Sequence, residues 1–338
     1  MTVLSVLRLI GWILLACAAL IVAFFYIGYP SRSKTTTYGM TWSKTYADYL
    51  GIDVNAGLRA ALTDFPEMKE VRIPAYWTEV EPTRGTWKWD WLDQQLKIVQ
   101  KADAKVILAV GAKQPRWPEC WVPTWAEQLS EKERQDARMT YVRAVLDRYG
   151  KHPAIVAWQV ENEPDFAFGT CDHTPRDFIR HEIQTVKNRL AELHPSDRPP
   201  VYTTESGELS TWVGYAAVTD GVGISVYRTI YAPWGIFNYP LFPWYYDRHA
   251  LLVKPWLKYV YVSEFQMEPW VKEDMLTSSM EEQFKTFSIE RMKKNFVYAE
   301  RIHLPSVHYW GVEWWYWMKI KNGHPEFWDE AKKILGGV

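Results

Sequence analysis

The 338-residue chain has little of what marks several common classes of protein. Its formal net charge is −1, so it lacks the basic surplus that binds nucleic acid, and we expect no nucleic-acid partner. No glycine-rich phosphate loop follows the first strand predicted below, which disfavours a nucleotide-binding fold. The sequence has no His and Cys spacing typical of a metal site. We therefore expect neither a metal nor an organic cofactor.

Cysteine is also scarce, with three residues in the chain. Cys120 and Cys171 lie in the loops after the third and fourth predicted strands, at the same end of the predicted fold. A disulfide between them would need an oxidising compartment, and hence a domain that faces outward. We predict this disulfide, and two buried free thiols are the alternative. Cys17 lies apart, in an apolar run near the N-terminus.

That apolar run is long enough to cross a membrane. Residues 9–27 contain no charged side chain and could span a hydrocarbon core of roughly 30 Å as a helix. A cleaved signal peptide is the competing interpretation, because Arg8 precedes the run. The run is longer than the apolar part of a usual signal peptide, so we predict a retained anchor. Arg32 and Lys34 lie on its other side, so charge does not decide its orientation.

The chain divides into three segments on this basis. We predict a membrane anchor in residues 1–30, a short polar and basic tether in 31–37, and one globular domain in 38–338. No internal repeat, low-complexity tract or second linker interrupts the globular part. Single α/β barrels of about 250 residues or more are common, so the length does not require two domains.

The globular part alternates apolar runs with helical patterns. The apolar runs predict strands at 38–42, 71–74, 105–110, 155–160, 201–204, 223–226, 259–263 and 306–310. The helical patterns lie at 91–102, 131–149, 176–193, 281–300 and 326–335. Nearly all-apolar strands that alternate with helices indicate a parallel sheet buried on both faces. Eight of them in about 300 residues favour an α/β fold of the closed (β/α)8 TIM-barrel type.

Two of the predicted strands end in a carboxylate. The run at 155–160 leads into an Asn-Glu-Pro sequence centred on Glu163, and the run at 259–263 is followed by Glu264. Strand ends of a parallel barrel meet at one face, where its active sites are built. Two carboxylates placed there are what glycoside hydrolysis requires. Glu268 competes with Glu264 if the later strand is longer than predicted.

Aromatic residues are abundant, with 20 Trp and 20 Tyr. Several Trp residues adjoin Pro, Gly or charged residues in predicted loops, among them Trp77 and Trp315. Trp offers the flat C–H face of a sugar a rigid apolar platform with a polar N–H at its edge. We expect about half of these rings, including Trp77 and Trp315, to contact carbohydrate, and the rest to pack between barrel and helices.

These stretches together resemble the clan A glycoside hydrolases of the cellulase type, closest to family five. The matching residues are 71–74, 158–164, 262–265 and 309–311, and the resemblance covers nearly the whole globular domain. It implies that Glu163 is the general acid/base and Glu264 the nucleophile of a catalytic domain. It also implies retention of configuration on a β-linked or otherwise equatorial substrate. Two histidines usual in family five are absent here, in the regions 110–113 and 225–227, so the resemblance leaves the substrate open.

The same chemistry gives roles to neighbouring residues. Glu163 must carry a proton at working pH, so its pKa has to be raised by burial or by the charge of Glu264. Glu264 must stay ionised, for which Arg72 is the candidate cation and Tyr227 the candidate hydroxyl donor.

Further residues are expected to meet the sugar directly. Asn162 can reach its 2-hydroxyl, and Trp310 would form the floor beneath it. Glu313, which lies among tryptophans, is expected to contact a substrate hydroxyl or to orient a neighbour. We group Arg72 and Tyr227 with these three as substrate-binding residues.

The sequence therefore predicts a retaining glycoside hydrolase that cleaves β-linked oligo- or polysaccharide. The predicted partners are a carbohydrate substrate and the membrane that the N-terminal helix crosses, with the catalytic domain outside the cytoplasm. A transglycosylase with the same carboxylates is one alternative, and a non-catalytic carbohydrate-binding barrel is another. The presence of both Glu163 and Glu264 disfavours the second alternative.

Overall fold

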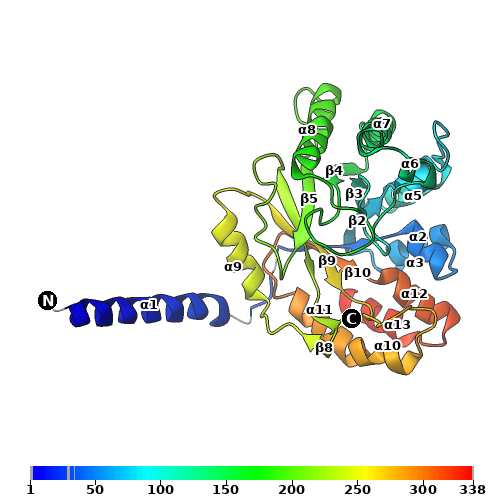
Figure 1. Ribbon diagram of the computed structural model, residues 1–338. Helices are drawn as coiled ribbons and strands as arrows, with labels where there is room; N and C mark the ends of the chain where they lie inside the picture. Colours follow the sequence, from blue (N-terminus) through cyan, green and yellow to red (C-terminus); the bar gives the residue numbers. More distant parts are fainter. Residues whose placement is uncertain (1–2, 29–30, 34, 337–338) are drawn as a thin grey trace.

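The computed structural model describes residues 3–28, 31–33 and 35–336. Parts of the predicted segments, namely residues 1–2, 29–30, 34 and 337–338, lie outside the described residues. The described part consists of an N-terminal helix that projects from a barrel surrounded by helices (Figure 1).

Eight parallel strands close into a barrel, in the order β1-β2-β3-β4-β5-β6-β9-β10 and back to β1. They are β1 (Thr37–Thr41), β2 (Met68–Pro74), β3 (Lys105–Val110), β4 (Ile155–Val160), β5 (Val201–Ser206), β6 (Gly221–Val226), β9 (Val260–Gln266) and β10 (Ser306–Trp310). The predicted (β/α)8 fold is confirmed. The strands are almost wholly buried, because barrel interior and surrounding helices cover their two faces.

The helices that surround the barrel turn an apolar face to the strands. They are α2 (Lys44–Tyr49), α3 (Val54–Asp64), α4 (Trp77–Val80), α5 (Asp90–Lys101), α6 (Thr124–Glu127), α7 (Glu131–Tyr149), α8 (Arg176–Leu193), α9 (Trp244–Val253), α10 (Met280–Thr286), α11 (Ile289–Ala299), α12 (Val312–Lys321) and α13 (Glu326–Leu335). Ser130 and Glu133 form a capping box at the start of α7. The predicted helices at 131–149, 176–193 and 326–335 agree with the structure.

The structure differs from the prediction in one helix, one strand end and one hairpin. The predicted helix 281–300 is two helices, α10 and α11, because the Ser288 hydroxyl accepts a bond from the Arg291 N–H and begins a new helix. Strand β9 continues to Gln266, past the predicted end at 263. A two-stranded hairpin, β7 (Thr229–Ala232) and β8 (Gly235–Asn238), follows β6 and was not predicted.

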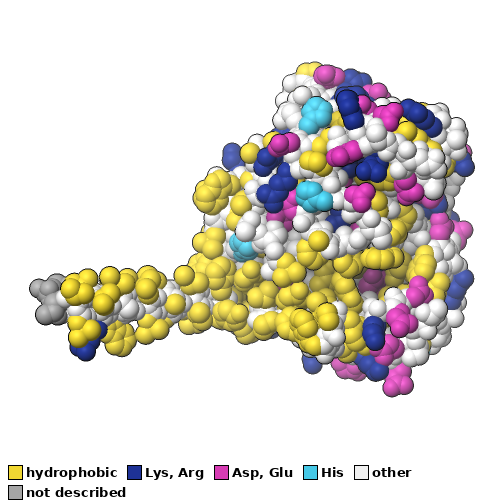
Figure 2. Space-filling model, in the orientation of Figure 1, with side chains coloured by type: hydrophobic (Ala, Val, Ile, Leu, Met, Phe, Trp, Pro, Cys, Tyr) yellow, Lys and Arg dark blue, Asp and Glu magenta, His cyan; other side chains and the backbone are white. Residues whose placement is uncertain are grey.

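The N-terminal helix α1 (Val3–Tyr26) has 24 residues, and none of them is buried. Its length and apolar composition would let it cross a membrane, and a signal sequence can have the same length and composition. Its C-terminal end packs on α9, where the Phe25 and Tyr245 rings lie 5.3 Å apart (Figure 1). A space-filling view shows the apolar surface of α1 running on over the adjoining side of the barrel (Figure 2).

Candidate active site

The two candidate carboxylates come from nearby strands of the barrel. Glu163 follows β4, and Glu264 lies within β9. Ser225 of β6 connects them, because it is in register with Glu264 while its hydroxyl donates to Glu163 Oε1 at 2.6 Å. Both carboxylates are buried, so each responds to its immediate partners more than to solvent.

Glu264 is held by two strong donors. The Arg72 guanidinium donates to its Oε1 at 2.7 Å, and the Tyr227 hydroxyl donates to its Oε2 at 2.9 Å. Arg72 is itself fully buried and also donates to the backbone carbonyl of Ser263 at 2.9 Å. A buried cation and a hydroxyl donor both favour the charged form of a carboxylate.

Glu163 has a different environment. Burial and then the charge of Glu264 raise the pKa of Glu163 to about 7, while the Ser225 hydroxyl, Lys113 and Arg72 act in the opposite direction. Its backbone has a positive φ of 44°, and its backbone N–H donates to the Thr204 hydroxyl oxygen at 2.9 Å. A carboxyl with this pKa keeps a proton in mildly acidic solution, as a general acid requires.

Asn162 shares a hydrogen-bond partner with each carboxylate residue, Arg72 with Glu264 and Thr204 with Glu163. Its Oδ1 accepts from Arg72 at 3.1 Å and from the Thr204 hydroxyl at 2.9 Å. Its Nδ2 is buried and has no hydrogen-bond partner among the residues that the structure describes. The amide is therefore fixed through its oxygen and has an unused donor, as the predicted contact with a sugar 2-hydroxyl requires.

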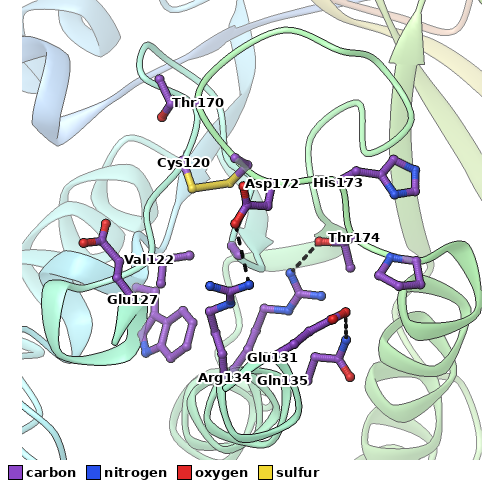
Figure 3. Close-up of a pocket in the computed structure, with 15 residues that line it drawn as sticks. Cys120, Val122, Glu127, Glu131, Arg134, Gln135, Thr170, Asp172, His173 and Thr174 are labelled. Carbon is purple, nitrogen blue, oxygen red and sulfur yellow. Dashed lines mark hydrogen bonds and ion pairs between the residues drawn. A yellow bond between two sulfur atoms is a disulfide. The ribbon is translucent and has the colours of Figure 1, made fainter. Parts of the chain in front are cut away.

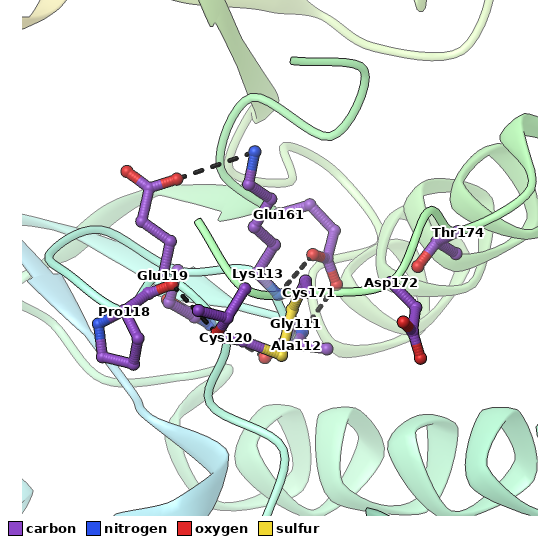
Figure 4. The surroundings of a disulfide bond; sticks show 12 residues. Gly111, Ala112, Lys113, Pro118, Glu119, Cys120, Glu161, Cys171, Asp172 and Thr174 are labelled. Carbon is purple, nitrogen blue, oxygen red and sulfur yellow. Dashed lines mark hydrogen bonds and ion pairs between the residues drawn. A yellow bond between two sulfur atoms is a disulfide. The ribbon is translucent and has the colours of Figure 1, made fainter. Parts of the chain in front are cut away.

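The loop after β3 is shaped by Glu161, a residue that the sequence did not single out. Glu161 has a positive φ of 58° and accepts from the backbone N–H groups of Ala112 and Lys113 at 2.6 and 2.7 Å (Figure 4). Gly111 passes so close that a Cβ there would lie 2.3 Å from Glu161 Oε1. Arg138 lies 3.3 Å from the same carboxylate, so this buried ion pair fixes the loop behind the site.

The predicted disulfide between Cys120 and Cys171 is present, and it joins the loops after β3 and β4 (Figure 4). Lys113 adds a second connection, because its ammonium donates to the backbone carbonyls of Glu163 and Phe166 at 2.9 and 2.7 Å. The disulfide and the lysine together fix the loop from which the Glu163 side chain projects.

A third carboxyl, Glu119, was missed by the sequence reasoning. Burial and then the charge of Glu163 raise its pKa well above the usual range, although Lys113 lies 3.6 Å from its Oε2. Its backbone has a positive φ of 62°. The sequence gives no signal for this residue, because a loop conformation, and no strand end, brings it to the site.

Arg116 organises the side of the site next to β10. Its guanidinium lies 3.9 Å from the centre of the Trp310 ring and 3.8 Å from that of Tyr46. It also forms ion pairs with Glu268 and Glu313. Trp310 is 6% exposed, so Arg116 leaves little of the ring for a sugar, and the predicted floor remains a prediction.

Glu268, the predicted alternative to Glu264, belongs to this Arg116 cluster. Burial raises the pKa of Glu268 to about 7, with Arg116 opposing the rise. Among the described residues, Arg72 and Tyr227 donate hydrogen bonds to Glu264 and not to Glu268. The donors needed by an ionised nucleophile therefore surround Glu264.

Several substrate-binding predictions are wrong. Trp77 is fully buried, where it stacks on Tyr141 and donates to Glu81. Trp315 is also fully buried, and its N–H donates to the Met267 carbonyl. Both rings pack between barrel and helices, so neither can serve as a sugar platform.

Arg72 and Glu313 are fully buried and bound by protein partners, so their predicted contact with a substrate stays a prediction. Glu313 accepts from the Ser43 N–H at 2.7 Å and from Arg116 at 2.8 Å, which matches the alternative prediction that it orients a neighbour. Arg72 acts on Glu264 and Asn162 instead, as a positioning residue.

Aromatic residues from the loops after β3, β4, β6 and β9 form a cluster next to Glu264. Phe168, from the loop after β4, lies 5.8 Å from Trp117 and 5.6 Å from Trp270, measured between ring centres. Trp270 in turn meets the Tyr227 ring edge-on at 5.2 Å. Tyr227 connects this cluster to Glu264, which is 2% exposed, and Glu163 is 5% exposed.

Of the cavities near the loops of this face, two differ in whether they reach a candidate carboxylate. One of about 250 Å³ reaches Glu163 and is lined by Asp165, Arg176, Glu205 and Ser206. The other, of about 530 Å³, lies behind the disulfide among Arg134, Arg138, Asp172 and His173 (Figure 3). The larger cavity includes neither Glu163 nor Glu264 in its lining, so the smaller one is the candidate leaving-group site. In the described ranges, no group of three or more His, Cys, Asp or Glu side chains could hold a metal ion.

Comparison with known sequences places part of the chain near one family. A family model described as Beta-galactosidase (glycoside hydrolase family 42) matches residues 60–194, which include β2 to β4 and Glu163 but not Glu264. The beta-galactosidase BgaA of Clostridium cellulovorans is 25% identical over 179 residues, 46% of this chain and 26% of that protein. The beta-galactosidase GanA of Bacillus subtilis is 25% identical over 134 residues, 34% of this chain and 20% of that protein. The chain thus spans about a quarter or less of these curated relatives.

Solved structures share the barrel. The beta-galactosidase from the psychrophilic Marinomonas ef1 aligns with a TM-score of 0.56 at 15% identity, over 81% of this chain and 54% of that one. GH5_18 from Streptomyces cattleya aligns with a TM-score of 0.57 at 12% identity, over 83% and 71%. At such identities both show the fold alone, so the closer resemblance to family five is not confirmed. The chain is a (β/α)8 barrel whose sequence, in residues 60–194, is similar to the beta-galactosidase family of glycoside hydrolases.

Proposed function

We propose that this protein is a retaining glycoside hydrolase that acts on β-linked sugars. One observation carries the proposal: two neighbouring buried carboxylates have opposite environments. Glu163 has a single hydroxyl donor and a pKa raised to about 7, whereas Glu264 is bound by a guanidinium and a phenol. Opposed environments of two carboxyls identify the acid and the nucleophile of a glycosidase.

In the first step of this mechanism, Glu163 gives its proton to the glycosidic oxygen while Glu264 attacks the anomeric carbon. The bond from that carbon to the leaving oxygen breaks, and a covalent glycosyl–Glu264 ester forms. Glu163, now ionised, takes a proton from water, whose oxygen attacks the anomeric carbon and releases Glu264. The free Nδ2 of Asn162 is the group placed to bind the 2-hydroxyl, a contact that strengthens in the transition state.

The substrate that we propose is a terminal β-galactoside. The sequence similarity to proteins named beta-galactosidase supports the sugar. The low exposure of both carboxylates supports removal of a terminal residue, because cleavage within a chain needs a groove open at both ends. The small cavity beside Glu163 would take the leaving group.

We further propose that α1 is a retained anchor and that the barrel faces outward. The uncharged run of α1 from residue 9 to residue 26 supports the anchor, and the disulfide supports an oxidising compartment. Intact mass measurement of the protein purified from membranes tests the anchor, because a cleaved signal peptide would remove Cys17 together with the helix.

Hydrolysis of a panel of nitrophenyl β-glycosides by the full-length protein tests the activity. We expect the β-galactoside to be the best substrate and the first product, followed by NMR, to be the β-anomer. Release of the α-anomer would contradict retention, and absence of turnover on every glycoside would favour the non-catalytic barrel.

Transglycosylation is the second candidate, favoured by the polar cavity at Glu163. Arg176 and Ser206 line it and could bind a sugar acceptor in place of water. Product analysis with lactose as both donor and acceptor distinguishes the two activities, since a transglycosylase would form trisaccharides from the start of the reaction.

A further inference from the structure

The exposed apolar side chains of the barrel are unevenly distributed. Of thirteen large apolar side chains that are exposed in the described residues after 28, six lie between 234 and 256. They are Trp234, Ile236, Phe242, Leu251, Leu252 and Trp256, at 79%, 39%, 43%, 59%, 51% and 65% exposure, and we call them the apolar flank. Rings and leucines exposed together to this extent mark a contact surface.

The apolar flank surrounds the point where α1 meets the barrel. Phe25 of α1 lies 5.3 Å from Tyr245, and Tyr26 lies 5.8 Å from Phe242, measured between ring centres. Gly28 passes so close to Trp244 that a Cβ at Gly28 would lie 2.0 Å from that ring. The end of the helix is thus packed directly against α9, and Figure 2 shows one continuous apolar surface over both.

The length of α1 determines how near the barrel comes to a bilayer. Its 24 residues span about 36 Å as a helix, and a hydrocarbon core of roughly 30 Å takes about 20 of them. Phe25 and Tyr26 therefore lie at the edge of the hydrocarbon, in the zone that Trp and Tyr favour. Because Phe25 contacts Tyr245 of α9 and Tyr26 contacts Phe242, the part of the apolar flank at Phe242 and α9 lies at the same depth.

Charge on this side of the barrel agrees with that placement. The segment 229–258 contains three Lys or Arg residues, Arg248, Lys254 and Lys258, against one acidic residue, Asp247. Basic residues beside exposed Trp and Leu are typical of segments that lie in an anionic membrane interface. Acidic and basic side chains are instead mixed over the side of the barrel away from α1 (Figure 2).

We infer that the apolar flank rests on the bilayer that α1 crosses, and that the active site consequently takes β-glycosides displayed at that membrane surface. The hairpin β7–β8 connects the apolar flank to the active site, since it begins two residues after Tyr227, the donor to Glu264. Gln266 at the end of β9 accepts from the Arg228 and Thr229 N–H groups and fixes the base of the hairpin at the rim of the site. The substrate class rests on the proposed glycosidase function, whereas the contact with lipid does not.

A fluorescent probe on the full-length chain tests the contact. In a Cys17→Ser background, Leu252→Cys and Ile320→Cys each supply one free thiol, because Cys120 and Cys171 are bonded to each other. Ile320 is a matched control, since it is 46% exposed, against 51% for Leu252, and lies on α12. Each variant is labelled with NBD and reconstituted in phosphatidylcholine–phosphatidylglycerol vesicles with and without doxyl-labelled lipid.

We expect the probe at 252 to show blue-shifted emission and quenching by doxyl lipid, and the probe at 320 to show neither. Equal exposure of both probes to water would overturn the contact, and so would equal quenching at both sites. Hydrolysis of a soluble nitrophenyl β-galactoside is measured on the same samples. If the galactoside is hydrolysed but the probe at 252 is exposed to water, the membrane contact is contradicted and the glycosidase function is not. If the probe at 252 is quenched but the galactoside is not hydrolysed, the glycosidase function is contradicted and the membrane contact is not.

The substrate class has its own test. Leu251→Asp with Leu252→Asp should leave the hydrolysis of the soluble galactoside unchanged. Hydrolysis of a β-galactosyl lipid in vesicles should fall about tenfold, because the interface loses the burial of two leucines. Ile320→Asp should change neither rate. An equal rate of lipid hydrolysis in the double variant and the wild type would overturn this inference.

Discussion

Ser225 donates to Glu163 and is in register with Glu264, yet the chain surrounds the two carboxylates in opposite ways. Burial and the charge of Glu264 dominate at Glu163 and raise its pKa to about 7. At Glu264, a fully buried arginine and a tyrosine hydroxyl both donate to the carboxylate. The difference shows that partners, and not burial alone, distinguish two buried carboxylates: Arg72 is buried with Glu264, whereas the charge of Glu264 is among the causes that raise the pKa of Glu163.

The largest expected effect comes from removal of Glu264. Glu264→Ala should lower kcat for an aryl β-galactoside by about 10⁴-fold or more, because no covalent intermediate can form. Added azide should restore turnover and give the α-galactosyl azide, as direct attack on the anomeric carbon inverts it. The variant leaves Arg72 as an unpaired buried charge, so Glu264→Gln, followed by circular dichroism, serves as the folding control. Formation of the β-galactosyl azide by Glu264→Ala would instead indicate that Glu264 is the acid/base and Glu163 the nucleophile.

Removal of Glu163 should have a smaller effect that depends on the leaving group. Glu163→Ala should lower kcat/KM by about 10²–10⁴-fold for lactose, whose leaving group needs a proton, and less for a dinitrophenyl galactoside. Azide should here give the β-galactosyl azide, because it replaces water in the second step. An equal loss on both substrates would contradict the role of general acid.

The two hydroxyl donors provide a matched pair. Tyr227→Phe removes a bond to the charged Glu264, and we expect kcat/KM to fall about 10–100-fold, as for loss of about 1.5–3 kcal/mol. Ser225→Ala removes the donor at Glu163, which should raise the pKa of Glu163 further and move the alkaline limb of the pH–rate profile upward. If both substitutions changed kcat/KM and the pH–rate profile in the same way, the proposed difference between the two carboxylates would be contradicted.

The pH dependence of the wild type follows from the state of Glu163. The acid is active when protonated, so kcat/KM should decline as pH rises through about 7, by about tenfold per unit above that pH. In Glu163→Gln the residual activity should lose this limb. A profile that is flat from pH 6 to 9 in the wild type would contradict the raised pKa.

The smallest expected effect is on stability. The folded pKa of Glu163 lies above its usual value, so the folded state binds the extra proton, and ionisation of Glu163 destabilises the protein as pH rises from about 4.5 to 7. The free energy of unfolding falls by at most about 3 kcal/mol through this ionisation. Glu163→Gln cannot ionise, so its Tm relative to the wild type should increase between pH 5 and pH 8. A constant difference in Tm would show that Glu163 titrates normally in the folded protein.

The sequence was a good guide where burial is continuous along the chain. Strands such as β3 and β4 are apolar at nearly every position, which is how a strand covered on both faces has to be built. The strand ends then placed Glu163 and Glu264 at one face. The Cys120–Cys171 disulfide followed from the same geometry.

The rest depends on conformations that no local pattern encodes. Arg116 and Glu119 reach the site from a loop with positive φ values of 80° and 62°, and their neighbours in sequence give no sign of it. Trp77 adjoins polar residues in sequence, but it begins a short helix that turns the ring into the core. Exposure of a single ring is set by the helices that pack over it, so sequence alone could not tell platforms from packing.

Trapping of the covalent intermediate is the most direct test that Glu264 is the nucleophile. The full-length protein is incubated with 2,4-dinitrophenyl 2-deoxy-2-fluoro-β-galactoside, which forms the glycosyl ester but hydrolyses it slowly, and labelled peptides are sequenced by mass spectrometry. The opposite environments of the two carboxylates predict a single label on Glu264. A label on Glu163 or Glu268, or none under conditions where the unfluorinated galactoside is hydrolysed, would contradict the assignment of the nucleophile.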